Sequence, residues 1–93
     1  MDINIDELCT SADLVIFSLT YCPFCTNAKR HAITLPLSFT LKVVEVDQHP
    51  LTNIIRKRLR SLTNISTLPL IFFRGRLIGD SATFVTKNLA TLH

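Results

Sequence analysis

The segment Leu14-Val15-Ile16-Phe17-Ser18-Leu19-Thr20-Tyr21-Cys22-Pro23-Phe24-Cys25 decides the fold of this chain. Its apolar beginning predicts a buried strand, and the residues from Pro23 onward predict a helix. Proline suits the first helical position, because the N–H that it lacks has no partner there. The unpaired N–H groups and the positive end of the helix dipole favour a thiolate at Cys22. A second cysteine one turn later can close a reversible disulfide, so the segment predicts redox chemistry.

Length and composition predict one domain, residues 1–93, with a single core. Apolar residues make up 47% of the chain, yet no apolar run reaches the roughly 18 residues that span a bilayer. The acidic N-terminus lacks the order of a signal peptide, so we expect a reducing, cytoplasmic location and no membrane association. In such a compartment a close cysteine pair is catalytic or metal-binding rather than a structural disulfide.

The net charge of +3 comes from clustered basic residues. Clusters occur at Arg56, Lys57, Arg58 and Arg60, at Lys29 and Arg30, and at Arg74 and Arg76. A solvated helix face explains most of the first cluster. Nucleic-acid binding requires a longer basic stripe interleaved with aromatic residues, which is absent. The charge instead suits a small anionic substrate or acidic protein partners.

Periodicity predicts alternating helices and strands along the whole chain. We expect a helix at 3–12, a strand at 14–19, a helix at 23–34 ending before Pro36, a strand at 41–46, a helix at 50–62, strands at 70–73 and 76–78 around an Arg74-Gly75 turn, and a helix at 82–90 capped by Ser81. The predicted inward-facing residues are Ala28, Ala32 and Ile33 in one helix and Ile54, Ile55, Leu59 and Leu62 in another. This order predicts an α/β fold with a four-stranded mixed sheet and helices on both faces.

Three motifs in this order and spacing resemble the glutaredoxin family of the thioredoxin-like superfamily. They are Thr20-Tyr21-Cys22-Pro23-Phe24-Cys25, Thr67-Leu68-Pro69, and Leu77-Ile78-Gly79 after the hairpin. The resemblance covers residues from about 12 to 90. It implies the thioredoxin-like fold and a cis peptide bond before Pro69, which is uncommon for X–Pro bonds in general. It also implies that the Leu68 backbone pairs with an extended peptide or with glutathione.

The cysteines have distinct expected roles. Cys22 lies at the exposed junction and is the expected nucleophile, which attacks a disulfide sulfur to give a mixed disulfide. Cys25 is shielded and resolves protein disulfides, or stands by while glutathione resolves the mixed disulfide. Tyr21 and Phe24 flank the sulfur, where they pack on substrate or cover the edge of the core. Cys9, on an N-terminal helix with apolar neighbours, is expected to be a core residue.

The resemblance also implies a set of glutathione or substrate contacts around the cysteines. Its members are Thr20, Tyr21, Arg56, Thr67, Leu68, Pro69, Gly79, Asp80 and Ser81. Arg56 stands where the family carries glutamine or arginine, and a guanidinium pairs with a carboxylate through two hydrogen bonds. Ser81 matches the family's Ser/Cys, and its backbone N–H is expected to hold the γ-glutamyl carboxylate.

The sequence departs from the family pattern in three ways. Leu19 replaces a lysine that pairs with the glycyl carboxylate of glutathione. Asp80 replaces the second of two glycines, where a side chain costs freedom at positive φ and a carboxylate raises the thiol pKa and repels an anionic tripeptide. Ala82 and Thr83 stand where the family carries an aspartate for the γ-glutamyl ammonium. Each lost contact costs roughly ten- to hundredfold in affinity, so we expect weak glutathione binding.

A structural zinc site is not expected at the cysteine pair. Such a site needs two further ligands, and the candidates show no ligand spacing. These candidates are Cys9, His31, His49 and His93. We therefore predict no metal and no tightly bound cofactor, with glutathione as a co-substrate.

The leading functional hypothesis is a monomeric dithiol oxidoreductase that reduces protein disulfides or glutathione mixed disulfides, with a reductase as electron donor. One alternative changes the donor to a thioredoxin-reductase-type enzyme, or restricts the protein to one dedicated partner. Another is a binding protein that shares a [2Fe–2S] cluster between two chains through Cys22 and glutathione, which Pro23 disfavours. A degenerate family member acting as an interaction module is the remaining alternative.

Overall fold

The computed structural model describes residues 4–35 and 38–86 of the chain. The elements follow the order α1 (Ile5–Cys9), β1 (Leu14–Ser18), α2 (Pro23–Ala32), β2 (Leu41–Glu45), the 3₁₀ helix η1 (Val46–Gln48), α3 (Thr52–Thr63), β3 (Leu70–Phe73), β4 (Arg76–Gly79) and α4 (Ser81–Thr86). Within these residues no helix is long and apolar enough to cross a membrane.

The strands form one mixed sheet in the order β2-β1-β3-β4. β1 pairs with β2 in parallel, whereas β1–β3 and β3–β4 are antiparallel. The α2 helix supplies the crossover that a parallel pair requires, and the β3–β4 pair needs only a tight turn. The predicted four-stranded mixed sheet is confirmed.

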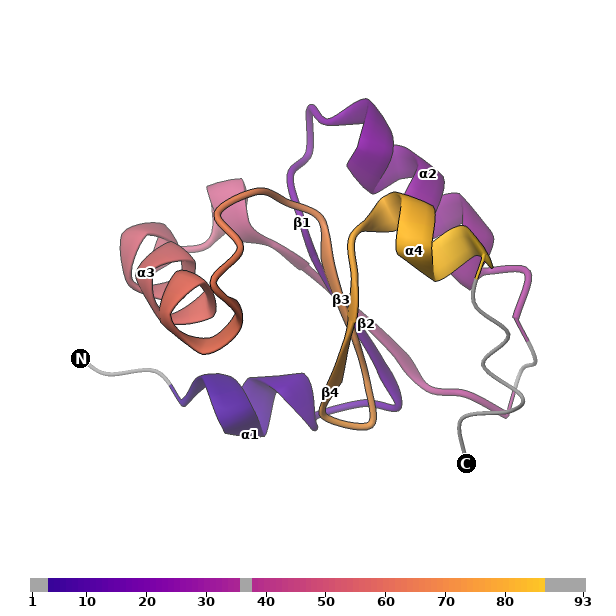
Figure 1. Cartoon of the computed structure of the whole chain (residues 1–93), viewed down its shortest axis with the longest axis horizontal. Coiled ribbons are helices and arrows are strands. Elements are labelled where there is room, and N and C mark those ends of the chain that lie inside the picture. The colour runs from indigo at the N-terminus through magenta and orange to yellow at the C-terminus, as the bar shows by residue number, and fades with distance from the viewer. Residues whose placement is uncertain (1–3, 36–37, 87–93) are drawn as a thin grey trace.

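Helices cover both faces of the sheet: α1 and α3 lie on one side, and α2 and α4 on the other (Figure 1). Alternation along β1 serves both layers, because successive strand residues point to opposite faces. Val15 and Phe17 pack with the α1–α3 layer, and Leu14 and Ile16 with the α2–α4 layer. The two-sided burial explains why β1 is an unbroken apolar run.

Strand register brings four chain segments to one end of the sheet. Ser18, at the end of β1, is opposite Glu45, at the end of β2, and Phe17 is opposite Leu70, the first residue of β3. Ile71 is in turn opposite Gly79, the last residue of β4. The segments that follow β1, β2 and β4 therefore meet the segment that precedes β3. Three of the four carry the motifs of the sequence analysis.

The element boundaries differ from the prediction in several places. Helix α1 is confined to Ile5–Cys9, and α2 ends at Ala32, so Ile33 is 73% exposed rather than facing the core. Leu62 is likewise exposed, although its spacing in α3 placed it with the inward residues. In both cases the residue lies in the last turn of its helix or just beyond it, where the neighbouring layer no longer covers it. Residue 3, Pro36 and residues 87–90, which the predictions also included, lie outside the described residues.

The strand ends shift by one residue for local reasons. Leu19 leaves β1 to enter the turn before the cysteines, and Val46 starts η1 instead of ending β2. The predicted Arg74-Gly75 turn is confirmed, with φ of 51° and 82° at its two residues. Two successive positive φ values define the turn that matches the twist of a two-residue hairpin.

Candidate active site

Cys22 is the N-cap of α2, and Pro23 is the first helical residue. The Cys22 side chain is half-buried. The Cys22 carbonyl accepts hydrogen bonds from Thr26 N at 3.0 Å and Thr26 Oγ1 at 3.2 Å. The pKa of the Cys22 thiol is lowered, first by the backbone N–H of Cys25, and further by the Cys25 side chain, the Phe24 N–H and the Lys29 charge. The helix N-terminus therefore stabilises a thiolate at this position.

Cys25 lies one turn further on and is completely buried. Its Sγ accepts a hydrogen bond from the Leu19 N–H at 3.2 Å. Burial raises the pKa of the Cys25 thiol, and the Cys22 sulfur beside it raises it further. The predicted shielding of Cys25 is confirmed, and the two sulfurs differ in both access and acidity.

This asymmetry suits thiol–disulfide exchange. An accessible thiolate attacks first, and a protonated neighbour remains protonated until a mixed disulfide forms beside it. Cys22, Cys25 and Cys9 are free cysteines in this structure. The pair can therefore cycle between a dithiol and a disulfide.

Two aromatic side chains form the exposed rim of the site. Tyr21 is 71% exposed and Phe24 is 66% exposed, so neither covers the edge of the core. Of the two roles considered for them, packing against a bound substrate is the one that their exposure favours. Aromatic rings supply apolar contact area at little cost in side-chain entropy.

The Leu68–Pro69 peptide bond is cis, as the resemblance implied. Pro69 is buried, Leu68 is half-buried and Thr67 is exposed. Because β3 starts beside the end of β1, this segment lies at the same end of the sheet as the cysteines.

A family model described as glutaredoxin matches residues 14–78, which is more than half of the chain. The chain belongs to the glutaredoxin family. Glutaredoxins are thiol–disulfide oxidoreductases, and the Cys22–Cys25 geometry agrees with that activity.

Several relatives support the assignment. A glutaredoxin of Ricinus communis is 39% identical over 82 residues, which cover 88% of this chain and 78% of that protein. The chloroplastic glutaredoxin-C4 of Oryza sativa subsp. japonica is 37% identical over 73 residues, or 78% of this chain. The matched part spans about half (53%) of that rice protein.

Solved structures agree on the fold. Reduced glutaredoxin C1 from Populus tremula x tremuloides superposes with a TM-score of 0.81 at 33% identity, covering 91% of this chain and 71% of the poplar chain. A buckwheat glutaredoxin–glutathione complex gives a TM-score of 0.77 at 30% identity, covering 85% and 70% of the two chains. The thioredoxin-like architecture is thereby confirmed.

Asp80 caps helix α4, a role that the sequence analysis gave to Ser81. Its Oδ1 accepts a hydrogen bond from Thr83 N at 3.0 Å and its carbonyl one from Phe84 N at 3.0 Å, so Asp80 rather than Ser81 caps α4. Ser81 is instead the buried first residue of that helix. Among the described residues, positive φ occurs at Gly79 but not at Asp80, so an aspartate in place of the second glycine introduces no strain. The net pKa shift of Cys22 is downward, against the rise expected from this carboxylate.

The other predicted glutathione contacts occupy separate positions around the site. Gly79 ends β4 at the same end of the sheet, whereas Arg56 is exposed on α3. Thr20 lies in the turn that leads to Cys22, where both its backbone and its hydroxyl are bound to Asp47. The contacts of these residues with glutathione or substrate therefore stay predictions.

The sequence analysis missed two residues at the site, Asp47 and Lys29. Asp47 binds Thr20, and Lys29 contributes to the low pKa of Cys22 while pairing with Glu45 at 3.2 Å. A signal for Asp47 was present: Thr20 and Asp47 are each the second residue after neighbouring parallel strands. Carboxyl ends of parallel strands meet at one edge, which places such residues together.

Cys9 is a core residue, as expected, and His31 and His49 make local structural contacts. Cys9 is buried between α1 and the sheet, and burial raises its pKa to about 11. His31 packs edge-on against Phe84 at 4.9 Å, and His49 Nδ1 accepts from Leu51 N at 3.0 Å. Among residues 4–35 and 38–86, no group of three or more potential ligands is placed to hold a metal ion.

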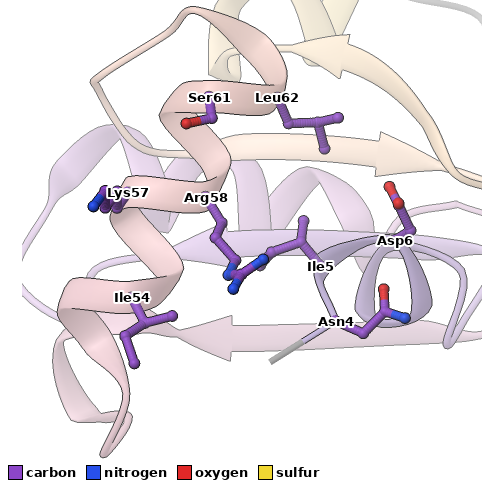
Figure 2. A pocket seen from close by; sticks show the side chains of 8 residues that line it. All are labelled: Asn4, Ile5, Asp6, Ile54, Lys57, Arg58, Ser61 and Leu62. Carbon is purple, nitrogen blue, oxygen red and sulfur yellow. The ribbon is translucent and has the colours of Figure 1, made fainter. Parts of the chain in front are cut away.

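A groove of about 970 Å³ lies away from the cysteines, between α1 and α3 (Figure 2). It is lined by Asn4, Ile5, Asp6, Ile54, Lys57, Arg58, Ser61 and Leu62. None of these residues belongs to the cysteine motif or to the expected glutathione contacts. The groove is therefore separate from the cysteine site.

Proposed function

We propose that this glutaredoxin reduces protein disulfides through the Cys22–Cys25 dithiol and accepts glutathione as a weak co-substrate in the cytoplasm. The observation that carries the proposal is the contrast between an accessible Cys22 with a lowered pKa and a buried Cys25 with a raised one. The exposed rings of Tyr21 and Phe24 offer a protein substrate an apolar contact on either side of the nucleophile.

The exchange proceeds in two steps, with a mixed disulfide between them. The Cys22 thiolate attacks one sulfur of the substrate disulfide, and the other sulfur leaves as a thiolate that takes up a proton. Cys25 then loses its proton and attacks Cys22 Sγ, which releases the second substrate thiol and leaves a Cys22–Cys25 disulfide. Two glutathione molecules, or a reductase, supply the two electrons that restore the dithiol.

Support for glutathione is mixed. The buckwheat relative is described in complex with glutathione, and Arg56 offers a guanidinium for a carboxylate. Leu19 and Ala82, however, provide no charge at two positions where the family carries one, and Asp80 uses one carboxylate oxygen to cap α4. These changes support weak rather than absent glutathione use.

Two single-cysteine variants test the proposal. C25S should still turn over a small glutathione mixed disulfide but lose reduction of an intramolecular protein disulfide, because no resolving thiol remains. C22S should lose both activities by at least about a thousandfold, because the attacking sulfur is removed. Retention of either activity in C22S, with folding verified by circular dichroism, would contradict the proposal.

A second candidate has a different electron donor, favoured by the same changes at Leu19, Asp80 and Ala82. In this case a thioredoxin-reductase-type enzyme, or one dedicated partner, reduces the Cys22–Cys25 disulfide. Turnover of one substrate with NADPH is compared using glutathione plus its reductase in one arm and thioredoxin reductase in the other. Robust, saturable activity with glutathione at cellular concentration eliminates this candidate, whereas activity only in the second arm establishes it.

A further inference from the structure

One carboxylate holds the turn that leads to the nucleophilic cysteine. Asp47 Oδ1 accepts a hydrogen bond from the Thr20 backbone N–H at 3.1 Å, and Asp47 Oδ2 accepts one from Thr20 Oγ1. Gln48 Nε2 donates to the same Oδ2 at 3.1 Å. A single side chain therefore binds both hydrogen-bond donors of Thr20. It comes from η1, which directly follows β2, the parallel neighbour of β1.

Thr20 occupies a sensitive place in the chain. The turn of residues 19–22 is closed by a hydrogen bond from Cys22 N to Leu19 O at 3.5 Å, which makes Thr20 its first central residue. The residue before it, Leu19, donates its N–H to Cys25 Sγ. The N–H groups of positions 19 and 20 are therefore fixed by the resolving cysteine and by Asp47. Any rotation of the turn would move Cys22 and disturb Cys25 together.

We propose that Asp47 is a positioning residue for thiol–disulfide exchange: through Thr20 it holds the 19–22 turn so that Cys22 stays at the N-terminus of α2 and Leu19 stays on Cys25. Asp47 does not touch the substrate or the reacting sulfurs. The carboxylate is suited to this task because a charged acceptor forms stronger hydrogen bonds than a neutral one, and its two oxygens accept from two donors at once. The Thr20 hydroxyl is the main cause of the lowered pKa of Asp47, because its hydrogen bond favours the ionised carboxylate.

The charge of Asp47 and its hold on the turn have opposite effects on the pKa of Cys22. This difference makes the proposal testable. A carboxylate near a thiol disfavours the thiolate, so neutralising Asp47 by electrostatics alone lowers the Cys22 pKa. Loss of the turn geometry instead weakens the N–H bonds from Cys25 and Phe24 that favour the thiolate, and raises that pKa. Lys29 on α2, whose charge lowers the Cys22 pKa, and its partner Glu45 on β2 are unchanged in every variant below.

The experiment compares D47N, T20V and T20S with the parent protein. The rate of iodoacetamide alkylation of Cys22 is followed from pH about 3 to about 9, together with kcat and KM for a mixed-disulfide substrate. D47N and T20V should move the alkylation midpoint to higher pH and reduce kcat/KM about tenfold, mainly through kcat, since misplacement affects the reacting geometry. T20S keeps the hydroxyl that binds Asp47 and should keep the alkylation midpoint of the parent protein.

Asp13 supplies a matched control at the opposite end of the sheet. Its Oδ2 accepts a hydrogen bond from Thr40 N at 3.1 Å, and its own N–H donates to Thr40 Oγ1 at 2.8 Å. D13N removes a carboxylate that likewise links the β1 and β2 segments, but it leaves the cysteine turn unchanged. This variant should have a lower free energy of unfolding and the same midpoint of Cys22 alkylation as the parent protein. An unchanged or lowered midpoint in D47N, or equal effects in T20V and T20S, would overturn the proposal. If D47N fails to fold, the T20V–T20S pair decides the question.

Discussion

The backbone N–H of Leu19 lies 3.2 Å from Cys25 Sγ and donates a hydrogen bond to it. Position 19 thus contributes to the site through its main chain, which every residue type other than proline provides. The leucine side chain is half-buried and adds no charge. A lysine at position 19 would therefore keep the N–H bond to the resolving cysteine and change only the side chain and its charge.

Replacing Leu19 by lysine should strengthen glutathione use. L19K keeps the N–H bond to Cys25 and adds an ammonium where the family carries one, so we expect about a tenfold rise in kcat/KM for a glutathione mixed disulfide. L19M, of similar size and no charge, is the control. A tenfold rise in L19M as well would show that charge is not the cause.

Alkylation should distinguish the cysteines. At neutral pH, iodoacetamide should modify Cys22 at least about a hundredfold faster than the others, because only Cys22 is both accessible and of lowered pKa. Cys25 is buried, and the Cys9 pKa is raised to about 11. Peptide mapping by mass spectrometry measures each rate, and rapid labelling of Cys9 in the folded protein would contradict the assignment of Cys9 to the core.

The Lys29–Glu45 ion pair should have a small effect on the pKa of the Cys22 thiol. Lys29 is a minor cause of the lowered Cys22 pKa, so K29M should raise that pKa and slow alkylation near neutral pH by less than about fivefold. E45Q should act in the opposite direction, because it removes a negative charge and leaves the ammonium uncompensated. K29R preserves the charge and should resemble the parent protein. The pH dependence of alkylation measures all three variants.

Stability should fall in acid. The pKa values of Asp13, Asp47 and Asp80 are lowered from 3.8, chiefly by hydrogen bonds from Thr40, Thr20 and Thr83. A lowered pKa in the fold means that the ionised form is favoured there, so this contribution is complete above pH 3.8 and is lost as the pH falls through the folded values. Urea unfolding at pH 7 and at pH about 2.5 measures the loss. The D13N/D47N/D80N triple variant should show a smaller difference between the two pH values.

The cap on α4 should be measurable by itself. D80A removes the acceptor for Thr83 N and should lower the free energy of unfolding by about 0.5–2 kcal/mol. D80N retains a capping oxygen and should lose only part of this. Urea unfolding at neutral pH measures both variants. Equal stability of D80A and the parent protein would show that the Asp80 bond contributes nothing to the helix.

Local pattern was sufficient for the order of elements and for the reactive pair. The apolar run of β1 and the cysteines that follow it predict a strand, a helix N-terminus and a thiolate, because all three depend on residues adjacent in the chain. The cis bond at Pro69 was implied by resemblance and is confirmed. Helix ends were predicted less well: Ile33 and Leu62 follow helical spacing yet are exposed, because burial depends on how far the neighbouring layer extends.

The sequence by itself determined the mixed sheet, the Arg74-Gly75 turn and the position of Cys22, since these follow from periodicity, φ preference and the helix N-terminus. Tertiary structure alone decided which distant groups support the cysteines. The parallel pairing of β1 and β2 brings Asp47 to Thr20, although the two residues are 27 positions apart in the chain. Such contacts depend on strand register, which a single sequence specifies only through the packing of the whole core.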